Sequence, residues 1–185
     1  MNMINLEAEE YSRLCEELKL NFGYILRISV GGFSAYLAIL NVGIGLQNAT
    51  IIASSVIPAI IGLIIVCSIF KANYRLSGYI QIFYEGKDSN IYWETRLLSL
   101  KSEPGFDLNR IKLMIFSPGI VYVANIMISF IYFQKNPDVN IPLAFYSIQI
   151  FELVSFLIAI YSVIHLQKAR EVYVNRWMDM QNKMI

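Results

Sequence analysis

Glu152 is the residue of this chain with the clearest potential for chemistry, because it is the only acidic side chain in the apolar stretch from Ile141 to Ile164. That stretch is long enough to cross a bilayer, for which about 20 apolar residues suffice. A carboxylate at such depth is costly, and acids in spanning segments mark ion pathways, proton relays or polar contacts inside a bundle. Glu152 is therefore a candidate for attracting cations or accepting protons.

Polar and small residues also follow one face of three apolar segments. At 100° per residue, the members of each set fall within a narrow sector of a helix. The first set is Arg27, Gly31, Ser34, Ala38, Asn41 and Gly45; the second is Pro118, Tyr122, Asn125, Ser129 and Tyr132; the third is Glu152, Ser155, Ala159 and Ser162.

These sets have two interpretations. In the first, small residues permit close helix approach and polar residues hydrogen-bond between helices. In the second, the sets line a hydrated path within one bundle or around an oligomer axis. We expect Asn125 and Glu152 to lie at similar depth and to be able to share a hydrogen bond. Arg27, nearer the cytoplasm, either reaches toward Glu152 or extends to the interface.

Motifs for enzymatic chemistry are missing from the sequence. It contains no metal-ligand cluster, no phosphate-binding glycine loop, and no Ser or Cys with a histidine base in a recognisable motif. We therefore predict that the protein is not an enzyme and uses no cofactor. The net charge of +1 and the lack of basic runs interleaved with aromatic residues argue against direct nucleic-acid binding.

The elements that carry these residues are predicted to be helices in a membrane. Hydrophobic residues make up 56% of the chain and charged residues 16%, whereas about a quarter of residues are charged in soluble domains. Apolar runs predict spans near 22–46, 51–70, 113–133 and 142–166, with a kink at Pro58. None has the charged outer face of a soluble helix. We predict an all-α, integral membrane four-helix bundle that forms a single domain over 1–185.

The basic residues predict the orientation of this bundle. Lys and Arg beside spanning segments favour the cytoplasmic side, and of the 15 basic residues only Lys135 falls in a predicted outer loop. Both termini are therefore expected in the cytoplasm. The lipid bilayer is the first predicted partner, and the predicted location is the inner (cytoplasmic) membrane of a bacterium.

Three cytoplasmic helical parts, 5–21, 71–112 and 167–185, are predicted from apolar stripes at helical spacing. The first is amphipathic and leads into the first span. The second continues the second span until Gly86, and a short helix over 91–101 follows. The last continues the fourth span, giving one helix from Pro142 to about Met184. Such stripes favour a homo-oligomer, although one protomer could also satisfy them internally.

One cytoplasmic segment carries a family resemblance. Its residues are Arg75, Tyr79, Ile80, Phe83, Glu85, Trp93, Glu94 and Arg96. Their spacing resembles a segment of small bacterial multi-span membrane proteins, and small four-span proteins of that sort include effectors and sensors of antiviral systems. The alternative for these residues is a structural stalk held by aromatic packing and acid–base pairs.

Two hypotheses for function follow. In the first, the protein is an oligomeric pore or membrane-perturbing effector, and the resemblance implies a role in antiviral defence. In the second, it is a non-conducting membrane sensor or adaptor whose cytoplasmic helices dock a cytosolic protein. Ion flux through a Glu152 variant would distinguish the two.

Overall fold

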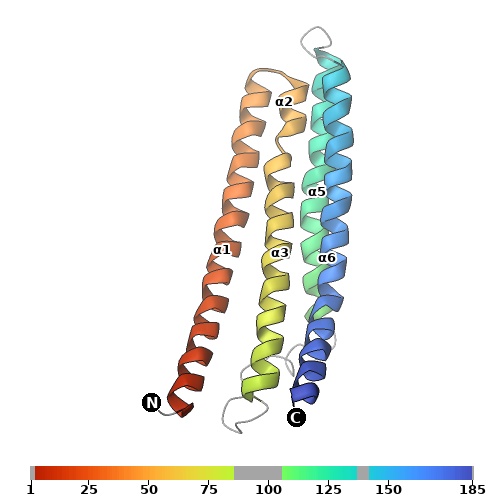
Figure 1. The fold of residues 1–185 in the computed structure, drawn as a ribbon. Coiled ribbons are helices and arrows are strands. Elements are labelled where there is room, and N and C mark those ends of the chain that lie inside the picture. Colours follow the sequence, from red (N-terminus) through yellow and green to blue (C-terminus); the bar gives the residue numbers. More distant parts are fainter. Residues whose placement is uncertain (1–2, 86–105, 137–141, 185) are drawn as a thin grey trace. The chain divides into compact units, whose positions relative to one another are not determined.

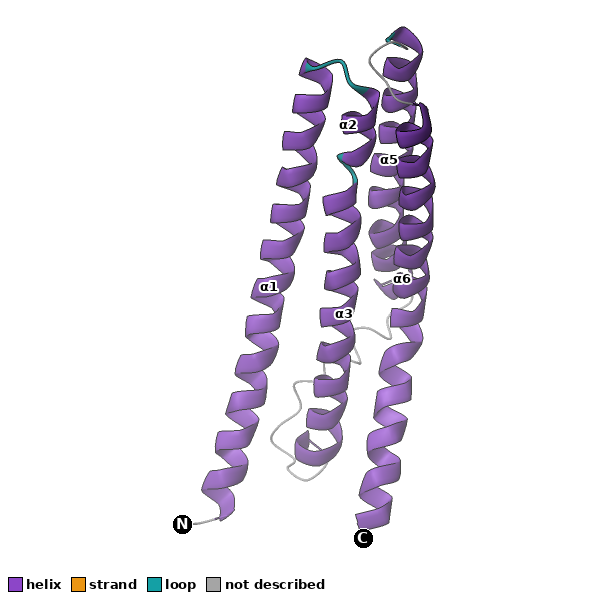
Figure 2. Ribbon diagram, turned by 45° about the horizontal axis from the view of Figure 1, so that its top comes forward, coloured by secondary structure: helices purple, strands orange, loops and turns teal. Residues whose placement is uncertain are grey.

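The computed structural model describes residues 3–85, 106–136 and 142–184, and all regular elements in these ranges are helices (Figure 1). Figure 2 shows the same elements by type, with short loops between α1 and α2 and between α2 and α3. The predicted all-α class is therefore confirmed. The elements are α1 (Met3–Gly45), α2 (Ala49–Ser54), α3 (Ile57–Ile80), the π-helix η1 (Gln81–Glu85), α5 (Phe106–Lys135) and α6 (Pro142–Met184).

Three stretches of helix in the described ranges are long and apolar enough to cross a membrane. They are Ala8–Gly45, Ala49–Tyr84 and Pro142–Leu166. The apolar segment Gly119–Lys135, within the predicted span 113–133, is shorter. Association with a membrane is thus supported by length and composition.

The two longest helices have the extents that the sequence predicts. Helix α1 runs without interruption from the amphipathic N-terminal part into the first apolar segment, and α6 runs from Pro142 to Met184. Each contains 43 residues. The predicted continuation of the second segment is also confirmed, because η1 follows α3 directly. The helix predicted over 91–101 lies outside the described residues.

The chain divides into two compact units. The first, here called the charged unit, comprises Met1–Leu26, Ser68–Arg110 and Ile164–Ile185, and the second, the apolar unit, comprises Arg27–Cys67 and Ile111–Val163. The boundaries lie within a few residues of the ends of the predicted spans. Only five ionisable Asp, Glu, Lys or Arg residues belong to the apolar unit: Arg27, Lys112, Lys135, Asp138 and Glu152.

A tight turn joins α1 to α2 in the apolar unit. Gln47 adopts a positive φ of 51°, and the Asn48 side chain caps α2 by accepting hydrogen bonds from the backbone N–H groups of Thr50 (2.9 Å) and Ile51 (3.1 Å). Asn is a preferred N-cap because its oxygen satisfies donors that the first helical turn leaves free. The turn returns the chain alongside α1, where Gly43 lies against Ile52.

The core of the apolar unit has two clusters of buried side chains. One is built from Tyr36, Val56, Ile60, Tyr122 and Ala159, so it joins α1, α3, α5 and α6. The other joins Ala49 and Ala53 of α2 to Phe145 of α6. The buried polar residues of this unit lie between the two clusters along the chain segments that form them: Ser55, Asn125, Ser129 and Glu152.

Candidate functional site

The second apolar segment is broken near its beginning, which the prediction of a single kinked span near 51–70 captured only in part. Helix α2 ends at Ser54 and α3 begins at Ile57. Pro58 follows at once and cannot donate a backbone hydrogen bond to the preceding turn, while its ring crowds the carbonyl four residues earlier. One turn before the proline, the backbone hydrogen bond that the Ala53 carbonyl receives from the Val56 N–H is long, at 3.5 Å.

Asn125 of α5 satisfies the backbone at this break. Its side-chain amide donates a 3.0 Å hydrogen bond to the Ala53 carbonyl oxygen, and its Oδ1 lies 3.0 Å from the Ser55 hydroxyl. That hydroxyl also lies 2.7 Å from the Ile52 carbonyl oxygen. Side chains from a neighbouring helix commonly satisfy backbone groups where a helix in an apolar segment is broken. Asn125 and Ser55 are both fully buried.

Glu152 is buried at the same level of α6. Its exposed fraction is 0%, and neither carboxyl oxygen has a hydrogen-bond partner within the described part of the chain. The hydrogen bond expected between Asn125 and Glu152 is therefore not formed, and the Asn125 amide donates to the Ala53 carbonyl instead. A buried polar group without a partner costs about 1–3 kcal/mol, and more if it is charged. Glu152 is thus a buried polar group of the apolar unit without a hydrogen-bond partner among the described residues.

Helices α5 and α6 run antiparallel and set the depth of these residues (Figure 1). Asn125 and Glu152 each lie ten residues, or about 15 Å, from the ends of their helices at Lys135 and Pro142. That distance is half the thickness of a typical hydrocarbon core, which is about 30 Å. A further polar contact lies nearby, where the Gln149 amide donates to the Ser129 hydroxyl over 3.1 Å.

Two stacked aromatic pairs bracket this polar layer of Ser55, Asn125, Ser129, Gln149 and Glu152. Tyr122 stacks on Phe156 and Phe133 stacks on Phe145, each with ring centroids 4.5 Å apart. Ser155 and Ser162, which the sequence groups with Glu152, are half-buried, whereas Ala159 is fully buried. The third set of residues therefore lies on the inner side of α6.

The polar and small set on α1 lies elsewhere. Arg27, Ser34 and Asn41 are exposed, together with Gly31, Ala38 and Gly45. The opposite side of α1 carries Tyr36, which is buried in the core. A Cβ added at Gly31 or Gly45 would meet nothing within 4 Å. The face formed by these six residues, here called the α1 stripe, points out of the apolar unit, and the structure does not bring Arg27 or Asn41 to Glu152.

The charged unit contains an aromatic cluster around Trp177. Tyr79 and Phe83 contact the Trp177 ring at centroid distances of 5.1 and 6.0 Å, and the indole N–H donates to the Arg75 carbonyl over 3.1 Å. The Tyr79 hydroxyl lies 3.4 Å from a Glu10 carboxyl oxygen. Of the residues that carry the resemblance, Tyr79 and Phe83 are thus engaged in packing, as the stalk interpretation predicts.

The remaining predicted residues of this segment are less defined. The Arg75 side chain is exposed and Glu85 is the last residue of η1. Trp93, Glu94 and Arg96 lie outside the described residues.

Sequence reasoning missed Ser55 as a site residue. Its position three residues before Pro58 was the available signal, since a hydroxyl beside a helix break commonly bonds a free carbonyl. Trp177, in the predicted helical part 167–185, was also missed as a site residue, because its hydrogen bond to Arg75 depends on how α6 meets α3.

No group of three or more His, Cys, Asp or Glu side chains that could hold a metal occurs within residues 3–85, 106–136 and 142–184. Comparisons with protein-family models, curated proteins and solved structures found no match. The functional argument therefore depends on the geometry alone.

Proposed function

We propose that this chain is an integral protein of a bacterial inner membrane, with four spans and both termini in the cytoplasm. Its copies assemble into an oligomer that conducts ions or otherwise perturbs the membrane. The three long apolar helices support membrane insertion, and the distribution of basic residues supports the orientation. The resemblance of the segment from Arg75 to Arg96 supports a role as an effector in antiviral defence.

One observation carries this proposal: the α1 stripe is exposed although α1 is long and apolar enough to span a bilayer. In a single protomer its polar members, Arg27, Ser34 and Asn41, would face lipid, where polar groups lack partners. Gly31, Ala38 and Gly45 on the same face permit close approach of helices. Copies that turn their α1 stripes toward one another would give these polar groups partners or water and would surround a shared axis.

Glu152 has a different role in this proposal. Its unpartnered carboxyl group destabilises the closed packing of α5 and α6 around the polar layer. Proteins retain such groups where function needs an easily opened structure. In this proposal Glu152 lowers the free energy that the apolar unit needs to rearrange. The oligomer can then pass from a closed to a conducting state.

The experiment that tests the proposal records membrane potential and the entry of a membrane-impermeant dye when the protein is expressed in bacteria. Wild-type protein is expected to depolarise the cells. Asn41→Leu, which makes the α1 stripe more apolar, is expected to reduce the effect. Ile44→Leu changes an exposed position on another face of α1 and is expected to retain it. Immunoblots of membrane fractions verify equal amounts of each protein.

Two outcomes would contradict the proposal. Unchanged potential and no dye entry at verified membrane levels, with any required trigger present, would exclude a conducting oligomer. The non-conducting sensor or adaptor would then be the better hypothesis. Equal flux through the Asn41 and Ile44 variants would exclude the α1 stripe as the lining of the path.

A further inference from the structure

Three contacts fix how α5 lies against α6 on both sides of Glu152. They pair Phe145 with Phe133, Gln149 with Ser129 and Phe156 with Tyr122. Each step forward along α6 is matched by an equal step backward along α5, as an antiparallel pair of helices requires. Glu152 therefore lies opposite the turn of α5 that carries Asn125, and both side chains are fully buried.

The polar groups of this turn and the next are already hydrogen-bonded elsewhere. The Ser129 hydroxyl donates to the Ile126 carbonyl oxygen over 2.9 Å and accepts from the Gln149 amide. The Asn125 side chain is engaged by the Ala53 carbonyl and the Ser55 hydroxyl. Neither oxygen of Glu152 has a hydrogen-bond partner in the ranges that the structure describes. The polar layer thus gives an ionised carboxylate no donor within hydrogen-bond distance.

No buried positive charge compensates Glu152 in the described part of the apolar unit. Arg27 and Lys135 are both exposed. The α2 helix contains no ionisable residue, and Tyr146 and Tyr161 of α6 are exposed. Tyrosine and cysteine never carry a positive charge, and the ionisable side chains buried with Glu152 in this unit are of these types: Tyr36 of α1, Cys67 of α3 and Tyr122 of α5.

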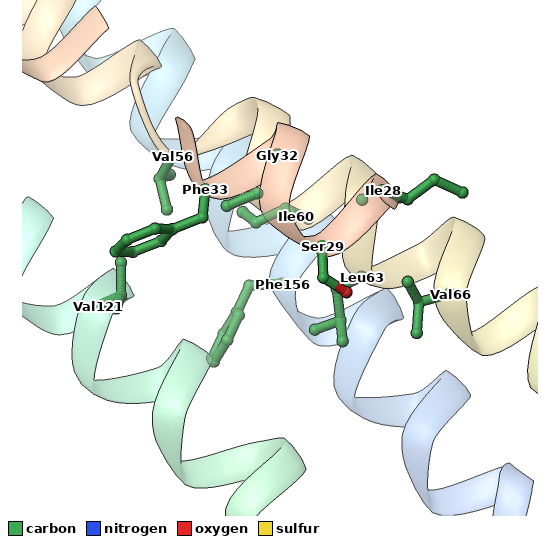
Figure 3. A pocket seen from close by; sticks show the side chains of 12 residues that line it. Ile28, Ser29, Gly32, Phe33, Val56, Ile60, Leu63, Val66, Val121 and Phe156 are labelled. Atoms are coloured by element: carbon green, nitrogen blue, oxygen red, sulfur yellow. The ribbon is translucent and has the colours of Figure 1, made fainter. Parts of the chain in front are cut away.

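The neighbouring groove of the apolar unit brings no charged partner either. Its volume is about 340 Å³, and its lining includes Val121 of α5 and Phe156 of α6, which is one helical turn from Glu152 (Figure 3). Ser29 carries the only polar side chain of the lining. Because an ordered water needs two to four polar partners, this groove does not supply a hydrated route to the carboxyl group.

These surroundings suit a proton better than a metal cation. Divalent cations take about six to eight oxygen ligands in proteins, whereas Glu152 has no second acidic side chain beside it among the described residues. A proton needs no further ligand, because it converts the carboxylate into a neutral acid. Burying an unpaired carboxylate costs far more free energy than burying a neutral polar group.

The geometry points to a proton-binding site: Glu152 is a neutral carboxylic acid in this packing and releases its proton to water only when the apolar unit rearranges. The inference rests on the proposed insertion of α6 in the membrane and deepens the role proposed for Glu152. The bound proton stabilises the closed form. Its release leaves an ionised carboxylate that favours water, so the open form is stabilised.

Infrared difference spectroscopy tests this inference on the full-length protein in phospholipid vesicles at neutral pH. The wild-type spectrum minus that of Glu152→Gln is expected to contain the carbonyl band of one protonated carboxylic acid. The same subtraction with Glu171→Gln, at an exposed position of the same helix, is expected to lack that band. A difference for Glu152→Gln that contains only the bands of an ionised carboxylate would overturn the inference. Equal circular dichroism and monodisperse size confirm that both variants fold.

An apolar carbodiimide gives a second test on wild-type protein. It adds to a protonated carboxyl group: the proton moves to a carbodiimide nitrogen while the carboxyl oxygen bonds to the central carbon. Peptide mass mapping is expected to find the adduct at Glu152. Adducts confined to acidic residues of the charged unit would refute the site.

Depolarisation of expressing cells tests the link between proton release and opening. Glu152→Gln has no proton to release and is expected to depolarise cells less than Glu171→Gln does. Equal depolarisation by the two variants would refute this link. The infrared and labelling experiments measure no ion flux, so a failure of the proton site is distinguishable from a failure of the conducting function.

Discussion

The side-chain amide of Asn125 donates a 3.0 Å hydrogen bond to the Ala53 carbonyl oxygen at the break between α2 and α3. This contact gives the Ala53 carbonyl a second donor besides the long 3.5 Å backbone hydrogen bond from Val56. Glu152, at the same depth, does not receive the hydrogen bond from this amide that the sequence suggests.

Asn125→Leu is expected to lower the free energy of unfolding. The substitution leaves the buried Ala53 carbonyl without its short hydrogen bond, which costs about 1–3 kcal/mol. Denaturant titration in micelles, followed by circular dichroism, measures the change. Gln149→Leu is the matched control, because it removes one contact from a half-buried side chain. A smaller loss for Asn125→Leu than for Gln149→Leu would contradict the capping role.

Glu152→Met is expected to stabilise the protein and reduce membrane depolarisation together. Methionine has a similar length and needs no hydrogen bond, so about 1–3 kcal/mol of unfolding free energy is gained. Glu152→Gln keeps a polar group at the site and should gain less. The same titration and the potential recordings measure both effects. A destabilised methionine variant would mean that the carboxyl group holds the apolar unit together.

Cysteine cross-linking tests the contact between copies along the α1 stripe. In a chain with Cys15→Ser and Cys67→Ala, Ala38→Cys is expected to form a disulfide-linked dimer in oxidised membranes. Leu37→Cys, which is exposed at nearly the same depth but on another face, should form much less. Non-reducing gels read the result, and equal dimer from both positions would argue against a specific α1 contact.

Gly43→Ala is expected to disrupt the α1–α2 turn. The new Cβ would lie 2.8 Å from both the Cγ1 and the backbone N of Ile52, so the two helices must separate, and overpacking of this kind costs about 1–3 kcal/mol. Gly23→Ala on the same helix meets nothing within 4 Å and should stabilise by up to about 1 kcal/mol. Thermal unfolding of the two variants should shift in opposite directions.

Trp177→Ala is expected to loosen the C-terminal part of α6 in the charged unit. It removes ring contacts with Tyr79 and Phe83, each worth about 0.5–1.5 kcal/mol beyond burial, and the hydrogen bond to the Arg75 carbonyl. Faster trypsin cleavage after Arg176 is the measurement. Met178→Ala, at an exposed neighbouring position, should leave the cleavage rate unchanged.

Much of the fold could be predicted from the sequence because apolar periodicity determines where helices run. The ends of α6 at Pro142 and Met184 agree with the prediction, since a proline can begin a helix and the stripe around Trp177 continues its inner face. The number of spans and the orientation of the termini remain predictions.

The candidate site was harder to predict because its partners come from different helices. Depth along α5 and α6 follows from counting residues, so Asn125 and Glu152 were expected at the same level. Their hydrogen-bond partners depend on the α2–α3 break, where the Ala53 carbonyl accepts a hydrogen bond from the Asn125 amide. The angular positions of residues around a helix also do not determine which face of α1 points inward. The α1 stripe is exposed.

The stacked pairs Tyr122–Phe156 and Phe133–Phe145 lie on either side of the polar layer along the α5–α6 seam. Water or an ion travelling along this seam must therefore displace a ring stack from either direction. Hydrogen–deuterium exchange of the residues between the stacks is then expected to be limited by ring motion.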